Sequence, residues 1–236
     1  MSIAGKVTVI TGATGNLGAA VTSRFLADGA RAALVYQDEG KLQALLPQLP
    51  EAGQRLALKA DVTDEVQVER LMGEVHERLG GPDILLNLVG GYTFGKKVVD
   101  LDLATWEHMM SLNLTSMFLC CRHALRHMLA QGYGRVVNVS SKAALDLPAG
   151  AAAYAVAKAG VTSFTTCLAH ELKGSGASVA AIMPSIIDTP ATRAAMPKAD
   201  FSKWVKPEEI AQAMAYLASD EGGAMNGAIV PLFGAL

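Results

Sequence analysis

The glycine-rich loop near the start of the chain restricts the fold more than any other feature. An apolar, β-branched run at Val7–Ile10 leads into this loop, residues 11–18, and an amphipathic helical pattern follows over Ala19–Ala27. A strand, a glycine loop and a helix in this order place exposed amides and the positive end of a helix dipole where a phosphate can bind. The loop therefore predicts a dinucleotide site in the first strand–helix unit. Its glycines are Gly12, Gly15 and Gly18.

Apolar runs and helical patterns continue to alternate along the chain. This alternation predicts an α/β fold, a single Rossmann-like, doubly wound parallel sheet of about seven strands with helices on both faces. We expect one NAD(P)-binding domain over residues 1–236. The segment at about 184–206 has no clear periodicity and is flanked by prolines, which is typical of a substrate loop or lid. The further strands are expected at Ala32–Tyr36, Leu56–Ala60, Ile84–Gly91, Arg135–Ser141, Ser178–Met183 and Gly227–Phe233.

The composition excludes several classes of protein. Of the 236 residues, 51% are apolar and 18% are charged, so a large buried core is expected and disorder is not. The net charge of −2, without a basic cluster, argues against nucleic acid as a partner. No apolar run approaches the roughly 20 residues of a membrane span, and no leader pattern precedes Val7. We expect a cytoplasmic protein with no membrane partner.

Cysteine and histidine do not predict a metal site. Three cysteines without paired-ligand spacing indicate free thiols, and the adjacent Cys120 and Cys121 fall in a helical run, where they should be buried. The third is Cys167. His123 and His127 are four residues apart but lack an HExxH context, which favours a solvated helix face.

One pair of side chains can carry reaction chemistry. Tyr154 and Lys158 are four residues apart on a predicted helix, so both can point into one site. A nearby ammonium is expected to lower the pKa of the Tyr154 phenol, which makes it a usable proton donor or acceptor. Ser141 is expected at the carboxyl end of a strand, the edge where ligands bind in open α/β sheets. Asn113 falls in an apolar helical region at about 102–130 and needs a hydrogen-bond partner there.

The choice of nucleotide stays open at the end of the second strand. An acidic residue there would bind a ribose 2′-hydroxyl, and a basic one would accommodate a 2′-phosphate. The residues are Tyr36, Gln37 and Asp38, with no lysine or arginine in the loop or at the strand end. Asp38 and Glu39 are equally well explained as solvated turn residues. Asp61, at the end of the third strand, could face an adenine, and Asp64 is a good N-cap for a helix to about Leu79.

Taken together, these motifs resemble the short-chain dehydrogenase/reductase family over essentially the whole chain. The resemblance implies that Tyr154 is the general acid, and that Lys158 lowers its pKa and binds the nicotinamide ribose. It further implies that Ser141 polarises a substrate carbonyl and Asn113 holds a water of a proton relay. It is carried by the glycine loop, Asp61, Asn87–Gly90, Asn113, Ser141, Tyr154, Lys158, Pro184 and Ile187–Pro190.

The resemblance also implies an NAD(P)(H) cofactor, with NAD or NADP undecided, a small-molecule substrate, and a homodimer or homotetramer formed through the Tyr154 helix and the last strand. The nicotinamide carboxamide would be held by the backbone of Ile187 and the hydroxyl of Thr189. The implied cofactor-binding residues are Gly12, Thr14, Asn16, Leu17, Tyr36, Asp61, Val62, Asn87, Val89, Gly90, Tyr154, Lys158, Pro184, Ile187 and Thr189.

Three functions remain open. The first is hydride transfer to a carbonyl, of a 3-oxoacyl compound or another ketone. The glycine spacing and the run from Asp188 to Trp204 are also similar to quinonoid dihydropteridine reductase, a branch that lacks the catalytic serine and carries an aspartate at the second strand end; this chain has Ser141 and lacks that aspartate. A dihydropteridine reductase-like enzyme is therefore the second function, and a non-catalytic dinucleotide-sensing module is the third.

Overall fold

The fold is a parallel sheet of seven strands between two layers of helices. The computed structural model describes residues 2–51 and 54–236, and its strands follow the order β3-β2-β1-β4-β5-β6-β7, with every neighbouring pair parallel. The prediction of a Rossmann-like doubly wound sheet is confirmed. The strands are β1 (Val7–Thr11), β2 (Arg31–Tyr36), β3 (Arg55–Lys59), β4 (Ile84–Asn87), β5 (Gly134–Val139), β6 (Ala177–Pro184) and β7 (Ile229–Leu232).

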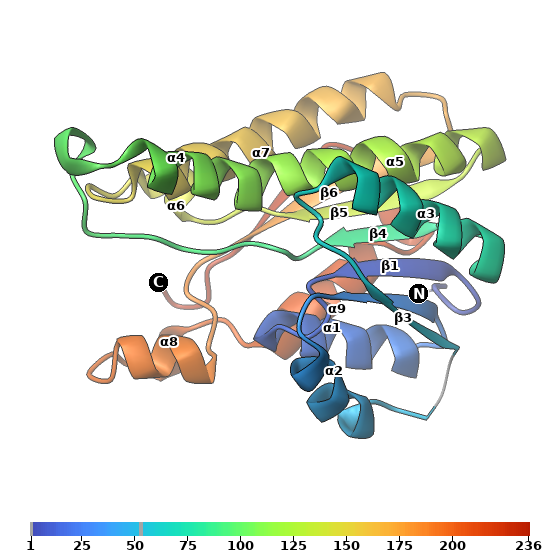
Figure 1. The fold of residues 1–236 in the computed structure, drawn as a ribbon, viewed down its shortest axis with the longest axis horizontal. Helices are drawn as coiled ribbons and strands as arrows, with labels where there is room; N and C mark the ends of the chain where they lie inside the picture. Colours follow the sequence, from blue (N-terminus) through green and yellow to red (C-terminus); the bar gives the residue numbers. More distant parts are fainter. Residues whose placement is uncertain (1, 52–53) are drawn as a thin grey trace.

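Helices cover both faces of this sheet (Figure 1). On one face lie α3 (Glu65–Leu79), α4 (Leu103–Met110), α5 (Ser116–Gln131) and α7 (Ala152–Glu171). On the other lie α1 (Asn16–Ala27), α2 (Glu39–Leu45) and α9 (Pro207–Leu217). Two short helices, α6 (Ala143–Asp146) and α8 (Pro190–Ala195), follow the carboxyl ends of β5 and β6.

The strands are apolar on both faces, because each face is covered by helices. Along β1, Val9 belongs to the apolar cluster that contains α3, α5 and α7, whereas the next residue, Ile10, belongs to the cluster that contains α1 and α9. Leu85 and Leu86 divide in the same way on β4. Such continuous apolar runs are typical of strands in buried parallel sheets.

Several helix and strand boundaries in the structure differ from the predicted ones. Asp64 caps α3 as expected, since its carboxylate accepts hydrogen bonds from the amides of Val66 and Gln67. However, α1 already begins at Asn16, three residues before the predicted start. The fourth strand ends at Asn87 rather than at Gly91. The fifth ends at Val139, so Ser141 lies in the loop beyond the strand.

The predicted helical region at 102–130 is interrupted at its middle. Between α4 and α5, residues Ser111–Thr115 form one turn of π-helix. Asn113 lies in this turn and is 1% exposed. A π-turn inside a helix is frequent at functional sites, because it places an extra residue in the turn and redirects its side chains.

The segment at 184–206 contains regular structure that its composition did not predict. Thr189 caps α8, and a short 3₁₀ turn follows at Phe201–Lys203. Ile187 and Val205 pair as an isolated parallel bridge, which joins the two ends of the segment. In Figure 1, α8 projects from the sheet on the side of its carboxyl edge.

The prediction of a solvated histidine face is wrong for His123. This side chain is 3% exposed, and its Nε2 lies 3.3 Å from Glu65 Oε1 on α3. The ring of His127 lies 4.7 Å from that of His76, so both histidines belong to the α3–α5 contact. Within residues 2–51 and 54–236, no three His, Cys, Asp or Glu side chains are placed to hold a metal ion.

The cysteines are free thiols, as predicted. Cys120 and Cys121 are buried, and Cys167 is exposed. In the part of the chain that the structure describes, no helix combines the length and apolarity that crossing a membrane requires.

Candidate active site

The glycine loop packs closely onto both of its neighbours. Gly12 has a positive φ of 64°, and a methyl group there would lie 3.2 Å from the Val89 side chain that follows β4. At Gly18, a methyl group would lie 2.1 Å from the Gly12 carbonyl oxygen. Only a glycine at this position lets α1 pack so closely beneath the loop. The spacing seen in the sequence thus has a direct steric reason.

A hollow of about 170 Å³ lies at the carboxyl ends of β1, β2 and β3. Six of the predicted cofactor-binding residues line it: Gly12, Thr14, Tyr36, Asp61, Val62 and Val89. The carboxylate of Asp61 is held in place by the amide and hydroxyl of Thr63, at 2.9 and 2.7 Å. The Asp61 carboxylate as an acceptor, the glycine backbone and the apolar Val62 fit an adenosine. Two further lining residues, Lys41 and Leu112, were not predicted.

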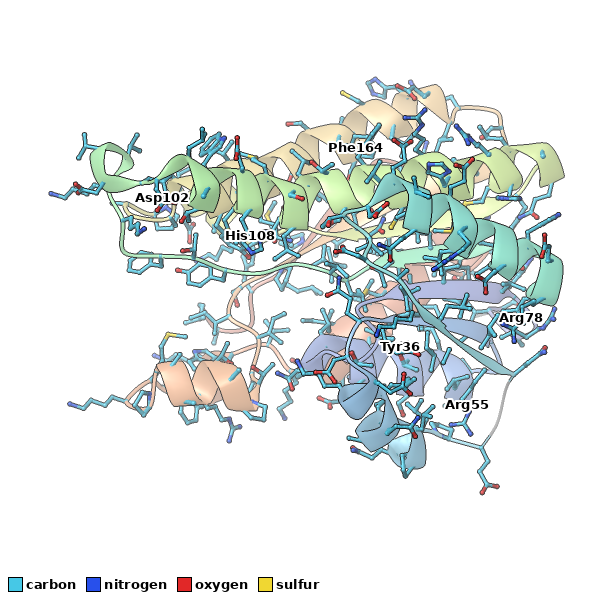
Figure 2. All side chains as sticks on the ribbon, viewed as in Figure 1. Tyr36, Arg55, Arg78, Asp102, His108 and Phe164 are labelled. Carbon is cyan, nitrogen blue, oxygen red and sulfur yellow. The ribbon has the colours of Figure 1, made fainter. Side chains whose placement is uncertain are left out.

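Asp38 is a helix cap rather than a solvated turn residue. Its carboxylate accepts the amide of Lys41 at 3.0 Å and so starts α2, a helix that the sequence patterns did not reveal. Glu39 accepts a hydrogen bond from the Tyr36 hydroxyl, which raises the pKa of Tyr36 and lowers that of Glu39. Figure 2 shows Tyr36 at the end of β2, above α2. Capping by Asp38 brings the Lys41 side chain to the hollow, although it lies five residues beyond the strand.

Other predicted cofactor residues lie around a second, larger cavity of about 550 Å³. Asn16, at the start of α1, and Thr189 both line it, together with residues of α9. The Thr189 hydroxyl accepts the amide of Thr192 at 3.2 Å, and the Ile187 carbonyl accepts the Thr192 hydroxyl at 2.6 Å. Leu17 packs against the apolar cluster around α1, and Pro184 ends β6.

Asn87 points away from this nucleotide surface. Its side-chain amide donates to Asn138 Oδ1 at 2.8 Å and to Cys121 Sγ at 3.3 Å, and the residue is 5% exposed. It does not line the 170 Å³ hollow. These contacts give the Asn87 side chain a structural role between β4, β5 and α5.

The four predicted catalytic side chains meet beyond the ends of β4 and β5. A methyl group on Gly90 would lie 2.9 Å from Asn113 Oδ1 and 3.3 Å from Lys158 Nζ, so both groups lie next to Gly90. Lys158 Nζ lies 5.9 Å from the centre of the Tyr154 ring. The Tyr154 hydroxyl is hydrogen-bonded to Ser141. Three segments, the π-turn, the loop after β5 and α7, therefore supply one site.

Burial governs the charge state of both Tyr154 and Lys158. Loss of hydration raises the pKa of the Tyr154 phenol, the hydrogen bond with Ser141 lowers it in part, and the nearby Tyr92 raises it again. The expected lowering by Lys158 is not found, and burial lowers the pKa of Lys158 itself to about 8. The protonated phenol is thus the favoured form at neutral pH, which suits a proton donor.

The position of α7 is set by groups that sequence patterns did not single out. Ser140, 1% exposed, donates from its hydroxyl to the Lys158 carbonyl oxygen at 2.9 Å. Asn138 on β5 donates to the Thr165 hydroxyl at 3.0 Å. These bonds hold α7 against β5, so the residue beside Ser141 fixes the helix that carries Tyr154.

Asn113 finds the partner that its burial requires. Its side-chain nitrogen donates to the Met109 carbonyl at 3.1 Å, and its oxygen accepts the Gly91 amide at 3.1 Å. The π-turn is therefore tied to the segment that follows β4. This segment carries Tyr92 and Phe94, two exposed aromatic residues that sequence reasoning also missed.

Comparison with known proteins agrees with this geometry. A family model described as short chain dehydrogenase matches residues 6–200. The chain is 36% identical to cis-4-hydroxycyclohexanecarboxylate dehydrogenase of Sinomonas cyclohexanicum, covering 99% of this chain and 97% of that protein. It is 32% identical to a 3-oxoacyl-[acyl-carrier-protein] reductase of Vibrio cholerae, covering 96% and 95% respectively.

The solved structures show the same relationship. The structure of a short-chain dehydrogenase/reductase from Burkholderia xenovorans superposes with a TM-score of 0.92 at 32% identity, over 98% of this chain and 96% of the other. The sequence match and the shared fold both extend over nearly the full length. The chain therefore belongs to the short-chain dehydrogenase/reductase family and is an oxidoreductase of that family.

Proposed function

We propose that the protein catalyses reversible hydride transfer between NAD(P)(H) and a ketone or secondary alcohol, with Tyr154 as the general acid in the reductive direction. The observation that carries this proposal is the meeting of Asn113, Ser141, Tyr154 and Lys158 at one edge of the sheet. Relatives named as dehydrogenases of cyclic alcohols and as 3-oxoacyl reductases support this class of substrate.

The cofactor would supply the hydride, and the residues of the chain would manage the proton. The Ser141 hydroxyl, beside the phenol, can donate to a carbonyl oxygen as negative charge develops there. Tyr154, protonated at neutral pH, can then deliver its proton to that oxygen. Lys158 and Asn113, both next to Gly90, would bind the nicotinamide ribose and a relay water, respectively.

The nucleotide surface fits a dinucleotide at several points. The loop glycines leave space that side chains would fill, and the 170 Å³ hollow offers Asp61 and Val62 to an adenine. Lys41 is the basic group that this hollow offers to a ribose 2′-phosphate, whereas the Asp38 carboxylate is engaged in capping α2. We therefore favour NADP(H). Fluorescence titration with NADPH and NADH tests this choice, and loss of the NADPH preference in Lys41→Gln is expected.

Ser141 favours carbonyl reduction over the two other functions. Reduction of a quinonoid dihydropterin by the branch that the segment Asp188–Trp204 resembles would not need the serine, and a sensing module would need none of the four groups. A Ser141→Ala enzyme that reduced dihydropterin normally would support the pterin function.

We further propose that the protein forms a homodimer or homotetramer through the faces of α5 and α7 and through β7. Phe118 and Val156 on these helices are 40% and 46% exposed, and Phe118 packs edge-on against Phe164, 6.1 Å away. Figure 2 shows Phe164 on α7, beside α5. Light scattering after size exclusion should give a dimer or tetramer mass, and Phe118→Asp should reduce it.

The decisive test is the Tyr154→Phe variant. We expect it to bind NADPH with unchanged affinity but to lose turnover of a ketone panel by about a thousandfold or more, since general acid catalysis contributes 10²–10⁴-fold. His170→Gln, at an exposed position near the carboxyl end of the same helix, is the control and should keep its activity. Full turnover by Tyr154→Phe would show the proposal to be wrong.

A further inference from the structure

Three aromatic rings form two successive ring pairs, beginning at Tyr154. The Tyr92 ring meets the Tyr154 ring edge-on, with centroids 4.9 Å apart and an interplanar angle of 87°. The Phe94 ring lies nearly parallel to that of Tyr92, at 6.3 Å and 9°. Edge-on and offset parallel pairs are the preferred arrangements of aromatic rings. The outer two rings nevertheless remain accessible, with Tyr92 63% and Phe94 59% exposed.

The short segment that carries these two rings is anchored at both ends. The Gly91 amide donates to Asn113 Oδ1 at 3.1 Å, and the Gly95 amide donates to the Gly150 carbonyl at 2.9 Å. Neither glycine could carry a side chain without cost, since a methyl group on Gly91 would lie 2.7 Å from Leu112 and Gly95 has a φ of 101°. The arch from Gly91 to Gly95 therefore presents its rings in a fixed place.

The arch has no charged residue, and two lysines near it are paired with carboxylates. Lys96, the first charged residue after it, pairs with Asp102 at 2.6 Å. Lys142, next to Ser141, pairs with Asp146 at 3.3 Å. Lys97 is exposed but lies beyond the arch, after Lys96. A carbonyl compound that approaches Tyr154 along the arch would thus meet aromatic faces.

We propose that Tyr92 and Phe94 form a recognition wall for the substrate, and that the favoured substrate is a carbonyl compound whose reacting group is part of, or attached to, a flat and uncharged ring. This inference rests on the proposed function, because it takes Tyr154 as the group that meets the carbonyl. An exposed aromatic face gains from stacking a ring, and it gains little from a short acyclic chain. The wall lies on one side of Tyr154 and so also selects the face from which the ring enters.

The test compares two ketones, 2-tetralone and acetoin, in the intact enzyme with NADPH. Phe94→Ala should lower the ratio of kcat/KM for 2-tetralone to that for acetoin by about tenfold, the loss of roughly one aromatic contact. Phe94→Trp, which keeps a ring, should restore the ratio. Val99→Ala, at an 88% exposed residue farther along the same connection, is the matched control and should not alter the ratio.

A binding measurement separates this proposal from the proposed function. Calorimetric titration of 2-tetralone into the enzyme with NADP⁺, which cannot reduce the ketone, should give a dissociation constant about tenfold weaker for Phe94→Ala than for wild type. Weaker binding without any turnover by wild type would contradict the proposed function and leave the wall supported. Turnover with an unchanged substrate ratio and unchanged binding in Phe94→Ala would overturn the wall alone.

Discussion

The ammonium of Lys158 donates a hydrogen bond to the backbone carbonyl oxygen of Val139, at 2.9 Å. The side chain is only 5% exposed, and this carbonyl belongs to the last residue of β5. The lysine is therefore tied to the sheet and is already in place beside Tyr154. The same burial makes its charge costly, which has a measurable effect on stability.

Lys158 should make stability depend on pH. Burial lowers its pKa to about 8, below the value of about 10.4 for an unfolded chain. Between these values the unfolded chain binds more protons, so the free energy of unfolding should rise with pH, by up to roughly 3 kcal/mol in total. Below pH 8 the full penalty is present. Urea unfolding of wild type and Lys158→Met at pH 7, 8 and 9 measures this contribution.

The difference in unfolding free energy between wild type and Lys158→Met should shift in favour of wild type as pH rises through 8 to 9. Lys198→Met, which removes an exposed lysine beyond α8, is the control for the loss of a lysine as such. A difference that stays constant over this range would mean that the ammonium of Lys158 is not penalised by burial.

Ser141→Ala should change the pH profile of the enzyme as well as its rate. The hydrogen bond with Ser141 lowers the pKa of Tyr154, opposing the effect of burial. Without it, the pKa of the phenol rises further, so the basic limb of kcat/KM for ketone reduction, where the phenol loses its proton, should move to higher pH. We expect a loss of about 10²-fold in ketone reduction. Steady-state rates from pH 6 to 10 check both effects, and an unmoved basic limb would contradict the role of this hydrogen bond.

Gly18→Ala should destabilise the protein through overpacking. The added methyl group would lie 2.1 Å from the Gly12 carbonyl oxygen, a backbone atom that cannot move without shifting the loop. We expect a cost of about 1–3 kcal/mol and weaker NADPH binding. Gly73→Ala in α3 is the matched control, because its methyl group would meet nothing within 4 Å and should stabilise the helix by roughly 0.5–1 kcal/mol. Urea unfolding should show a lower free energy of unfolding for Gly18→Ala, and a higher one for Gly73→Ala, than for wild type.

Asn113→Ala should lower stability and activity together. It leaves the Gly91 amide without its acceptor in a partly buried place, at a cost of about 1–3 kcal/mol. Ser116→Ala removes one hydroxyl bond, to the Leu112 carbonyl at 2.7 Å, at the other end of the same turn. The comparison therefore isolates the link to the arch. Equal losses of stability and of kcat in the two variants would contradict this linking role.

Periodicity and end signals were sufficient for most of the fold. Local sequence predicted the seven strands, the cap at Asp64 and the proline that opens α9. Strands buried on both faces appear as continuous apolar runs, and helix starts carry characteristic capping residues. The helix α2 did not, since it spans only seven residues and shows little apolar periodicity. Its capping residue, Asp38, is equally compatible with a solvated turn when only the sequence is considered.

The candidate site likewise contains residues that the local sequence predicts and residues that it does not. Ser141, Tyr154 and Lys158 were found because their chemistry and spacing are recognisable in the sequence. Tyr92, Phe94 and Lys41 were missed, since their importance depends on which segments the fold brings together. The side-chain contacts of Asn87 and the burial of His123 were not predicted, for a related reason. The partners of their side chains, Asn138 and Glu65, lie about fifty residues away in the chain.

The π-turn at Ser111–Thr115 can be seen as a helix with one residue too many. Each residue of a regular helix turns the chain by about 100°. Removing one residue from this turn would leave an uninterrupted α-helix from α4 to α5 but would swing Asn113 away from the Gly91 amide. The extra residue thus interrupts the regular hydrogen-bond pattern of the helix and directs the Asn113 side chain toward the site. Deleting one residue here should therefore preserve the helix and abolish the activity of the enzyme.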